Sequence, residues 1–279
     1  MNGIIVVNKE RGYTSRDVVN IISNTLHTKK VGQTGTLDPM AEGVLVITVG
    51  KCTKLCDYLT SEYKEYIAEF DLGYLTDTLD STGNILKTSD IVVNYNDVIN
   101  VVNSFKGKYN QIVPLYSAVK INGKKLYEYA RNNIDINLPS REVDIKKIEL
   151  LSFGKNIKMR CLVSKGTYIR SLIRDIGDKL GTYATMTSLI RTKSGKFNIE
   201  NSFILDDIKN GNYKLITIDE IFSLFPKINI DNEMYKSISN GNIVDNKYGS
   251  EYVLFYYKDE LISIYKVYKK SKMKPFLMF

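Results

Sequence analysis

The carboxylate of Asp38 lies in the stretch where residue types and spacing most suggest chemistry. The stretch reads VGQTGTLDPMAEGVL, in which a glycine- and threonine-rich approach leads to an aspartate and a proline ahead of an apolar run. Residue types alone leave two interpretations open. Gly35, Asp38 and Pro39 are common turn formers, and a simple turn is the more frequent use of such residues. The alternative is a functional carboxylate placed just before a strand.

Other residue types narrow the chemistry because so few of them are present. The one histidine, His27, is near the expected end of a helix, where a solvated side chain or an interaction with the helix dipole is the expected role. Cys52, Cys56 and Cys161 are fewer ligands than a zinc site needs, and we interpret them as small apolar groups in a reducing compartment. The sequence has neither a phosphate-loop motif nor a G-x-G-x-x-G dinucleotide fingerprint. A mechanism without a metal or a nucleotide cofactor is therefore favoured.

Composition bounds the class of protein and its partners. A chain of 279 residues with 43% hydrophobic residues can bury a large core, and its length fits one large domain and one small domain. The 39 Lys and Arg against 31 Asp and Glu give a formal net charge of +8, which favours a polyanionic partner. No apolar run approaches the roughly 20 residues of a membrane span, and the first residues do not resemble a signal peptide. We therefore expect a folded protein of the cytoplasm.

The hydrophobic pattern predicts strands and helices in irregular alternation. Buried or alternating apolar runs predict strands at residues 3–9, 44–49, 64–73, 115–123, 141–153 and 156–164. Helical spacing with capping residues predicts helices at residues 16–26 (with Ser15 as N-cap), 52–59, 94–107, 124–133 and 167–181. Strands that pair with nearby strands, with helices interspersed, favour the fold class α+β with a mixed sheet. After a boundary near Pro226, a helix and a hairpin-rich β segment indicate a second, small domain.

Six segments of the sequence, taken in order, resemble the motifs of one family. They are GIIVVNKERGYTS, VGQTGTLDPMAEGVL, KEYIAEFDLGYLTDTLDSTG, PLYSAVKINGKKLYEYAR, SREV and SKGTYIRSLIRDIGDKLG. Together they resemble the TruB family, the bacterial tRNA pseudouridine-55 synthases, in which G-[TA]-L-D-P carries the catalytic aspartate. The resemblance covers residues 3 to about 195 and is highly specific.

This resemblance implies a particular fold and domain organisation. Residues 1–225 would form the pseudouridine synthase domain, with a mixed, mostly antiparallel sheet flanked by helices. An insertion at about residues 122–140 would clamp the T-loop arm of the RNA. Residues 226–279 would form a small, β-rich, PUA-like RNA-binding domain.

The resemblance also implies the reaction, which is isomerisation of uridine 55 in the T-loop of tRNA to pseudouridine without a cofactor. The N1–C1′ glycosidic bond breaks, the uracil turns, and C5 joins C1′. Asp38 matches the family's catalytic nucleophile, and Arg170 matches the arginine that pairs with it. Tyr66 matches the tyrosine that stacks on the uracil and is placed to help remove the C5 proton. Whether Asp38 attacks C1′ or C6, or assists glycal formation, stays open.

Further residues match positions that bind substrate in the family. Tyr168 and Leu189 would line the pocket of an extruded uracil, and Gln33 would enter the RNA loop. The other residues expected to bind the substrate are basic: Lys9, Lys124, Lys125 and Arg131. Asp77 and Asp80 could be cation ligands by residue type, but the matching segment of the family is structural, and we assign no metal.

The chain departs from the family pattern at three positions. Gln33 replaces the usual histidine, so a ring that can stack and become cationic is exchanged for an amide that can hydrogen bond. Glu10 replaces the proline that usually follows Lys9, and Val113 replaces the first of two prolines. We expect neighbouring packing to absorb both of these changes.

Two functions from different classes fit the sequence. One is the isomerase, and the other is a tRNA-binding folding chaperone in which catalysis is secondary. The joint presence of Asp38, Tyr66 and Arg170 favours the enzyme, because a pure binder needs no carboxylate facing phosphate-rich RNA. A guide-dependent modifier of ribosomal RNA is less favoured, because no long basic tail is evident. The expected partner is the T-arm stem-loop of tRNA, bound by a monomer with no obligatory protein partner and no membrane.

Overall fold

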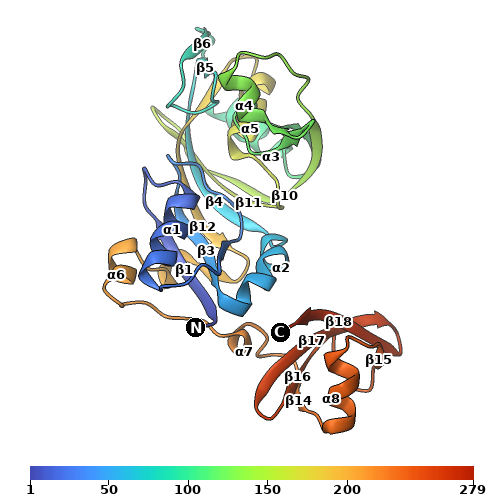
Figure 1. The fold of residues 1–279 in the computed structure, drawn as a ribbon. Coiled ribbons are helices and arrows are strands. Elements are labelled where there is room, and N and C mark those ends of the chain that lie inside the picture. Colours follow the sequence, from blue (N-terminus) through green and yellow to red (C-terminus); the bar gives the residue numbers. More distant parts are fainter.

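The computed structural model describes residues 1–279 and shows a larger domain on a wide sheet and a smaller β-rich domain at the carboxyl end (Figure 1). The strands of the larger domain are β1 (Gly3–Lys9), β2 (Val31–Gln33), β3 (Glu42–Val49), β4 (Lys64–Leu72), β5 (Tyr74–Thr76), β6 (Ile85–Thr88), β7 (Gly107–Ile112), β8 (Lys120–Ile121), β9 (Lys124–Lys125), β10 (Ser140–Ser152), β11 (Ile157–Val163), β12 (Ala184–Ser194) and β13 (Phe197–Asn198). Its helices are α1 (Ser15–Thr25), α2 (Cys56–Thr60), α3 (Tyr95–Ser104), α4 (Leu126–Arg131), α5 (Ile169–Lys179), α6 (Leu205–Lys209) and α7 (Ile218–Ile221), with short 3₁₀ helices η1 (Gly50–Leu55) and η2 (Ile199–Asn201).

The wide sheet is mixed and mostly antiparallel. It has nine strands in the order β1-β3-β12-β4-β11-β10-β7, with β2 beside β3 and β13 beside β12. Every pairing in it is antiparallel except that of β3 with β12. The predicted α+β class is therefore confirmed.

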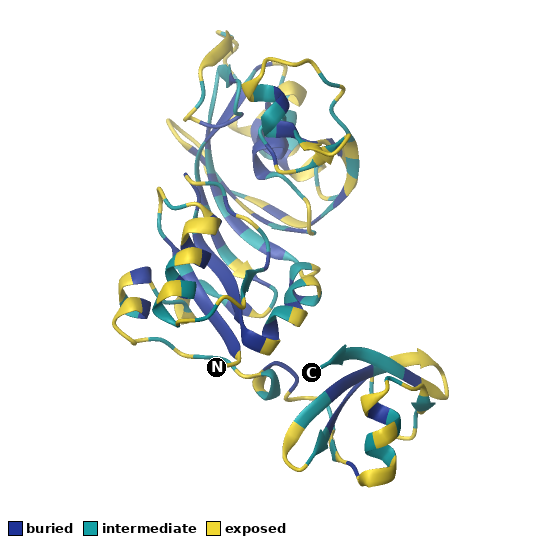
Figure 2. Cartoon of the chain, viewed as in Figure 1, coloured by how far each residue is buried: buried dark blue, intermediate teal, exposed yellow.

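Strand β1 is buried on both faces, which explains its continuous apolar run. Ile5 and Val7 belong to a core of 31 buried residues that also includes side chains of α1, α3, α5 and α6. Ile4 and Val6 point to the other face, where they pack with η1, α2 and part of the small domain. Alternate side chains of a strand face opposite sides of a sheet, so this one short strand joins two cores. Figure 2 shows the central strands as the most continuously buried part of the chain.

The start of α1 differs from the sequence prediction in a way that matters for the loop carrying Asp38. Thr14, rather than Ser15, is the N-cap: its Oγ1 accepts from the Asp17 amide at 3.1 Å, and the Asp17 carboxylate accepts from the Thr14 amide at 2.8 Å. Such a cap stabilises a helix by about 1 kcal/mol. The Ser15 hydroxyl is then free to bond the backbone of Leu37, accepting from its amide at 2.9 Å and donating to its carbonyl at 3.2 Å.

Several elements were not predicted, among them β7 at the edge of the wide sheet, and two of the errors concern segments that line the site. The strand expected at residues 115–123 is only the two-residue β8, which pairs with β9 as a small hairpin. Residues 115–119 stay irregular because their backbone bonds other segments, as when the Ser117 carbonyl accepts from the Tyr127 amide at 3.1 Å. Strand β12, to which no element was assigned, lies in the middle of the sheet between β3 and β4. Two register shifts interrupt its pairing with β4 and obscure a simple alternation.

The small domain is a five-stranded sheet with one helix. Its elements are β14 (Lys227–Asn229), α8 (Asn232–Ser239), β15 (Val244–Asp245), β16 (Tyr252–Tyr257), β17 (Glu260–Lys269) and β18 (Lys272–Met278), with the strand order β14-β16-β17-β18-β15. It leans on the larger domain through aromatic rings: the ring centroid of Tyr58 in α2 lies 6.0 Å from that of Tyr252 and 5.5 Å from that of Phe276. The PUA-like character of this domain stays a prediction. No helix of the protein is long and apolar enough to cross a membrane.

Candidate active site

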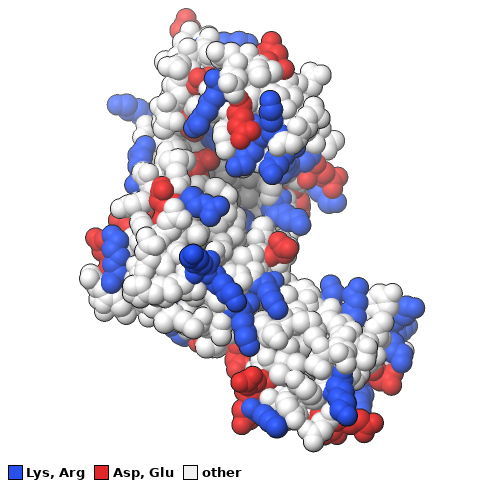
Figure 3. All heavy atoms as spheres, viewed as in Figure 1, with Lys and Arg blue, Asp and Glu red and all other residues white.

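A cavity of about 930 Å³ lies in the larger domain, where segments distant in sequence meet. Its walls come from the start of α1, the loop between β2 and β3, strands β4 and β12, the start of α5, and α4. Figure 3 shows a hollow in this face of the molecule with Lys and Arg side chains gathered around it. Six of the residues expected at the site line this cavity: Asp38, Tyr66, Arg131, Tyr168, Arg170 and Leu189.

The loop that carries Asp38 is fixed from several sides. Two hydrogen bonds join the Ser15 hydroxyl to the backbone of Leu37, the residue before Asp38. On the other side of Asp38, the Pro39 carbonyl accepts from the Gly12 amide at 2.8 Å. Gly35 has φ +101°, a conformation that favours glycine. The loop is therefore built to hold the carboxylate still, which is more than a simple turn requires.

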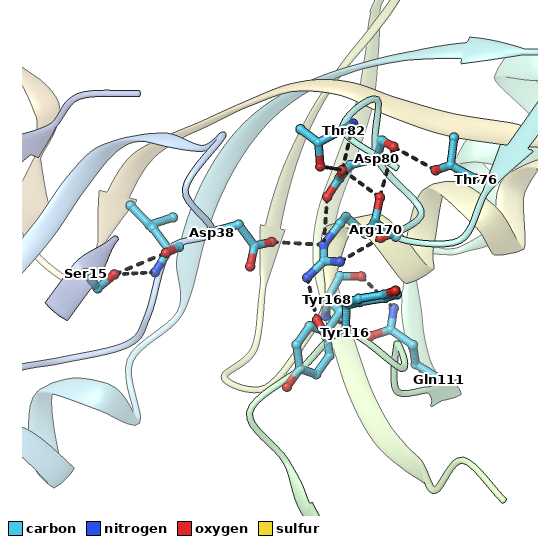
Figure 4. A network of polar contacts seen from close by, with 11 residues as sticks. Ser15, Asp38, Thr76, Asp80, Thr82, Gln111, Tyr116, Tyr168 and Arg170 are labelled. Atoms are coloured by element: carbon cyan, nitrogen blue, oxygen red, sulfur yellow. Dashed lines mark hydrogen bonds and ion pairs between the residues drawn. The ribbon is translucent and has the colours of Figure 1, made fainter. Parts of the chain in front are cut away.

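Arg170 is the centre of the polar network at the site (Figure 4). It lies in the first turn of α5 with 5% of its side chain exposed, and its Nε is 2.9 Å from Asp38 Oδ2 and 3.7 Å from Asp80 Oδ2. Its Nη1 donates to the Thr78 carbonyl at 2.7 Å, and its Nη2 donates to the Tyr116 carbonyl at 3.0 Å. The rigid fork of a guanidinium suits such a set of acceptors, and it both orients the Asp38 carboxylate and balances its charge.

Asp80 is a functional candidate that the sequence analysis set aside as structural. Its side chain is only 6% exposed, and its Oδ1 accepts from the Thr78 hydroxyl at 2.8 Å, the Thr82 amide at 3.0 Å and the Thr82 hydroxyl at 2.5 Å. These bonds leave Oδ2 to face Arg170. The signal in the sequence was the pair of threonines two residues on either side of the aspartate.

Arg191 is a second residue that the sequence analysis missed. It lies in β12 directly across from Tyr66 in β4, is 1% exposed, and donates from Nη1 to the Tyr66 hydroxyl at 3.4 Å. Its Nη2 donates to the Gly35 carbonyl at 2.9 Å, so one side chain touches both Tyr66 and the loop of Asp38. The available signal was its spacing of two from Leu189, since such residues share one face of a strand.

Tyr168 occupies the N-cap position of α5 and is held by a buried glutamine. Gln111 is fully buried; its Oε1 accepts from the Tyr168 amide at 2.8 Å, and its Nε2 donates to the Tyr168 carbonyl at 3.1 Å. The Arg141 guanidinium lies 5.6 Å from the centre of the Tyr168 ring. The ring also packs on the small core of the insertion that contains Leu126 and Tyr129. The insertion and the wall of the cavity are thus mechanically joined.

Lys9 does not reach the cavity and is a correction to the set of expected substrate contacts. It is fully buried, and its Nζ donates to the carbonyls of Tyr13 at 2.7 Å, Glu10 at 3.0 Å and Pro39 at 3.4 Å. Burial lowers its pKa to about 8, partly offset by Glu42 and Asp38. An ammonium so enclosed cannot touch an RNA phosphate; its contact with Pro39 supports the loop of Asp38.

Gln33, Lys124 and Lys125 also lie outside the cavity lining. The Gln33 Nε2 donates to the Thr36 hydroxyl at 3.3 Å, and its Oε1 is buried without a partner. Lys124 is exposed in β9, and Lys125 lies with its ammonium 5.3 Å from the centre of the Tyr127 ring. Arg131 lies on the same ring at 5.4 Å and does line the cavity.

The departures from the family pattern are absorbed locally. The Glu10 carboxylate accepts from the Leu205 amide at 3.3 Å, and Val113 is fully buried in a small core with Leu126 and Tyr129. His27 is exposed directly after α1, away from the cavity. Cys52 and Cys161 are buried, and burial raises their pKa values to about 11 and about 12, so these thiols are unreactive. Cys56 is half-buried against the Thr48 hydroxyl.

Solved structures share this fold. A chain of a Cbf5–Nop10–Gar1 complex superposes with a TM-score of 0.72 at 26% identity, covering 99% of this chain and 84% of that one. A chain of an H/ACA RNP bound to a substrate RNA containing 2′-deoxyuridine gives a TM-score of 0.69 at 24% identity, covering 99% and 83%. The second likeness, at such low identity, concerns the fold alone.

The family models place the chain among the pseudouridylate synthases, a class of isomerases. The model of the TruB family pseudouridylate synthase N-terminal domain matches residues 23–169, and that of the tRNA pseudouridylate synthase B C-terminal domain matches residues 170–220. The chain therefore belongs to the TruB family of pseudouridylate synthases. The second match ends before residue 226, so the small domain lies outside both models.

Relatives extend the similarity over the whole chain. The tRNA pseudouridine synthase B of Clostridium tetani is 46% identical over 253 residues, which cover 88% of this chain and 87% of the relative. The proteins of the same name from Fusobacterium nucleatum and Staphylococcus aureus are 43% and 42% identical and cover 99% and 100% of this chain, and 99% of each relative. Residues 226–279 are thus part of the shared architecture.

Proposed function

We propose that this TruB-family synthase converts uridine 55 in the T-loop of tRNA to pseudouridine. The observation that carries the proposal is the Asp38–Arg170 pair, 2.9 Å apart, in a cavity that also contains Tyr66. The name tRNA pseudouridine synthase B, borne by relatives at 40–46% identity, supports tRNA as the substrate.

Asp38 acts as the nucleophile in the proposed mechanism. Its side chain is 37% exposed on the cavity side while Arg170 holds one carboxylate oxygen, so Oδ1 is available to the substrate. Attack at C1′ or at C6 of the base, or assistance to glycal formation, would each use this oxygen. In each case the N1–C1′ bond breaks, the uracil turns within the cavity, and C5 takes the place of N1 on the sugar.

The target base must leave its stack to reach Asp38. Extrusion costs a few kcal/mol, which contacts elsewhere on the RNA must offset. Tyr66 and Leu189 are both less than 10% exposed and line the cavity with Tyr168, so they offer a stacking face and an apolar wall for the uracil. A cavity of about 930 Å³ leaves room for the detached base to rotate beside the ribose.

The RNA backbone would be held by basic side chains around the cavity. Arg16, Arg131 and Lys165 are exposed and line its edge, and the first and last of these were not foreseen from the sequence. The exposed Lys124 extends the same positive charge along the insertion. Residues of α4 and Tyr168 share a small apolar core. Binding of the T-arm by the insertion would therefore also fix the position of Tyr168 in the wall of the base pocket.

We further propose that the protein acts alone, as a monomer, on free tRNA in the cytoplasm. A chain of similar fold occurs in a Cbf5–Nop10–Gar1 complex, but relatives that are 42–46% identical are named tRNA pseudouridine synthase B. A role as an RNA chaperone alone would leave the fixed Asp38–Arg170 pair without a use.

The test is to map pseudouridine in an unmodified full-length tRNA transcript after incubation with the purified protein and nothing else. Carbodiimide mapping with mass spectrometry should find one new pseudouridine, at position 55. A transcript with cytidine at that position is the matched control and should gain none. Modification at several other uridines, or a requirement for a guide RNA, would overturn the proposed substrate.

A further inference from the structure

Arg191 carries a buried positive charge that no carboxylate balances. Its side chain is 1% exposed, and none of the ion pairs in the structure includes it. Its three hydrogen bonds go to the carbonyls of Val44 and Gly35, at 2.6 and 2.9 Å, and to the Tyr66 hydroxyl at 3.4 Å. Removing a charge from water without a counterion is costly, so such an arrangement points to a function.

The carbonyls of Val44 and Gly35 fix the Arg191 guanidinium so that its Nη1 points to the Tyr66 hydroxyl. Arg191 and Tyr66 are direct partners across β12 and β4, and the guanidinium carbon lies 6.0 Å from the centre of the phenol ring. A guanidinium can only donate hydrogen bonds, so the phenol oxygen accepts from Nη1 and its own proton must point elsewhere. Both residues line the cavity that contains Asp38. The phenol therefore presents its oxygen to the cavity beside a fixed positive charge.

The second cation near Tyr66, the ammonium of Lys64, already has other hydrogen-bond partners. The Lys64 ammonium donates to the carbonyls of Thr60 and Glu62, at 2.7 Å each, and none of its hydrogen bonds goes to the phenol. Burial lowers the pKa of Lys64 to about 8. Arg191 is thus the cation whose geometry suits an anionic form of Tyr66.

We propose that Arg191 is a positioning residue that orients the Tyr66 hydroxyl and stabilises its phenolate, so that Tyr66 can accept the C5 proton of the uracil. This inference rests on the proposed function and deepens it by naming the group that supports the base. The uncompensated charge of Arg191 in the resting protein is then balanced when the phenolate forms.

The proton transfer balances without any further reactant. After C5 joins C1′, C5 still carries its hydrogen, and the ring has a C6=N1 double bond. The phenolate oxygen takes the C5 proton, the C–H electron pair forms the C5=C6 double bond, and the C6=N1 pair takes a proton at N1. The N1 proton comes from solvent, which also takes the proton that the resting Tyr66 phenol loses when the phenolate forms, so each turnover ends with the neutral phenol and no net change in protons.

The test measures one turnover on a T-arm stem-loop whose target uridine carries deuterium at C5, with saturating protein. Arg191→Gln should slow the reaction about a hundredfold, within the range of a lost acid–base contribution, and should show a clear primary isotope effect that exceeds that of the wild type. Arg191→Lys keeps the positive charge but loses the planar guanidinium, so its rate and its isotope effect should both lie between those of the wild type and Arg191→Gln. Arg160→Gln, on the neighbouring strand β11 with its side chain 47% exposed, is the matched control and should behave as wild type.

Two comparisons separate positioning from general structural damage. In a Tyr66→Phe background, adding Arg191→Gln should slow the reaction no further, because the hydroxyl on which Arg191 acts is already absent. A large additional loss there, or a slow Arg191→Gln variant without an increased isotope effect, would overturn the inference. If thermal unfolding shows that Arg191→Gln does not fold, Arg191→Lys decides: an unchanged isotope effect in that variant overturns the proposal. Wild-type protein that makes no pseudouridine on the unlabelled stem-loop would instead refute the proposed function.

Discussion

Removal of the Arg170 charge should destabilise the protein mainly through Asp80. The Asp80 side chain is 6% exposed, whereas that of Asp38 is 37% exposed and can be hydrated once its partner is gone. A buried carboxylate that loses its cation costs about 3–5 kcal/mol, and the bonds from Thr78 and Thr82 place the expected cost for Arg170→Gln at the lower end. At roughly 2–4 °C per kcal/mol for a chain of this size, a cost of about 3 kcal/mol lowers Tm by roughly 6–12 °C.

The double variant Arg170→Gln, Asp80→Asn should recover most of this stability, because no uncompensated buried charge remains. Its activity should not recover, since Asp38 still has no guanidinium beside it. Loss of that one charge-assisted contact, about 2–3 kcal/mol, lowers kcat by roughly 30- to 150-fold.

The assay pairs unfolding midpoints with single-turnover pseudouridine formation for each single variant and the double variant. Arg160→Gln serves as the control for loss of a guanidinium at the surface, where little change is expected. A double variant as unstable as Arg170→Gln, or an Arg170→Gln protein with the unfolding midpoint of the wild type, would contradict the role given to Asp80.

Three further predictions concern Gln33, the pair Lys124 and Lys125, and Lys9, all of which lie outside the cavity lining. Gln33→Ala should lower kcat/KM by about 1 kcal/mol of transition-state stabilisation, typical of one hydrogen bond, and Tyr66→Ala should be far worse in single-turnover kinetics. Replacing Lys124 and Lys125 together by Ala should flatten the fall of log affinity with log salt, since each neutralised phosphate contributes roughly 0.7–0.9 to that slope. The pKa of Lys9 is lowered from 10.5 to about 8 in the folded protein, so the unfolded chain binds more protons between these pH values. The free energy of unfolding of the wild type should therefore rise from pH 8 to 10.5 relative to that of Lys9→Met, as measured by urea denaturation.

Each of these predictions has an outcome that contradicts it. A Gln33→Ala protein as slow as Tyr66→Ala would give glutamine a direct part in the chemistry. An unchanged salt slope in the lysine double variant would place the RNA on another surface. A difference in unfolding free energy that stays flat with pH would mean that the Lys9 ammonium is not desolvated in the fold.

Local patterns in the sequence, such as the apolar run of β1, were enough to predict the fold class. The central pair of the site, Asp38 and Arg170, was predicted from the resemblance of several motifs in order to one family, because residue types alone also fit a simple turn and a surface arginine. The irregular backbone at residues 115–119 was mistaken for a strand because its hydrogen bonds go to α4 and to Arg170, which no local pattern reveals.

The remaining parts of the site depend on contacts between distant segments. Asp80 is important because Oδ2 meets Arg170, 90 residues later in the chain, and Arg191 because it meets Tyr66 across the sheet. Lys9 was expected at the RNA as one of the basic residues of the matched motifs, yet three carbonyls enclose its ammonium. Such roles follow from the tertiary structure rather than from residue type or spacing.

The central claim is that the Asp38 carboxylate, held by Arg170, carries out the chemistry. Its most direct test is pseudouridine formation in one turnover by purified Asp38→Asn protein, free of host enzyme, with RNA affinity measured on the same stem-loop. The amide keeps the shape but cannot attack, so we expect no pseudouridine while affinity stays within about tenfold of the wild type. Pseudouridine formation by Asp38→Asn at a rate near that of the wild type would contradict the claim.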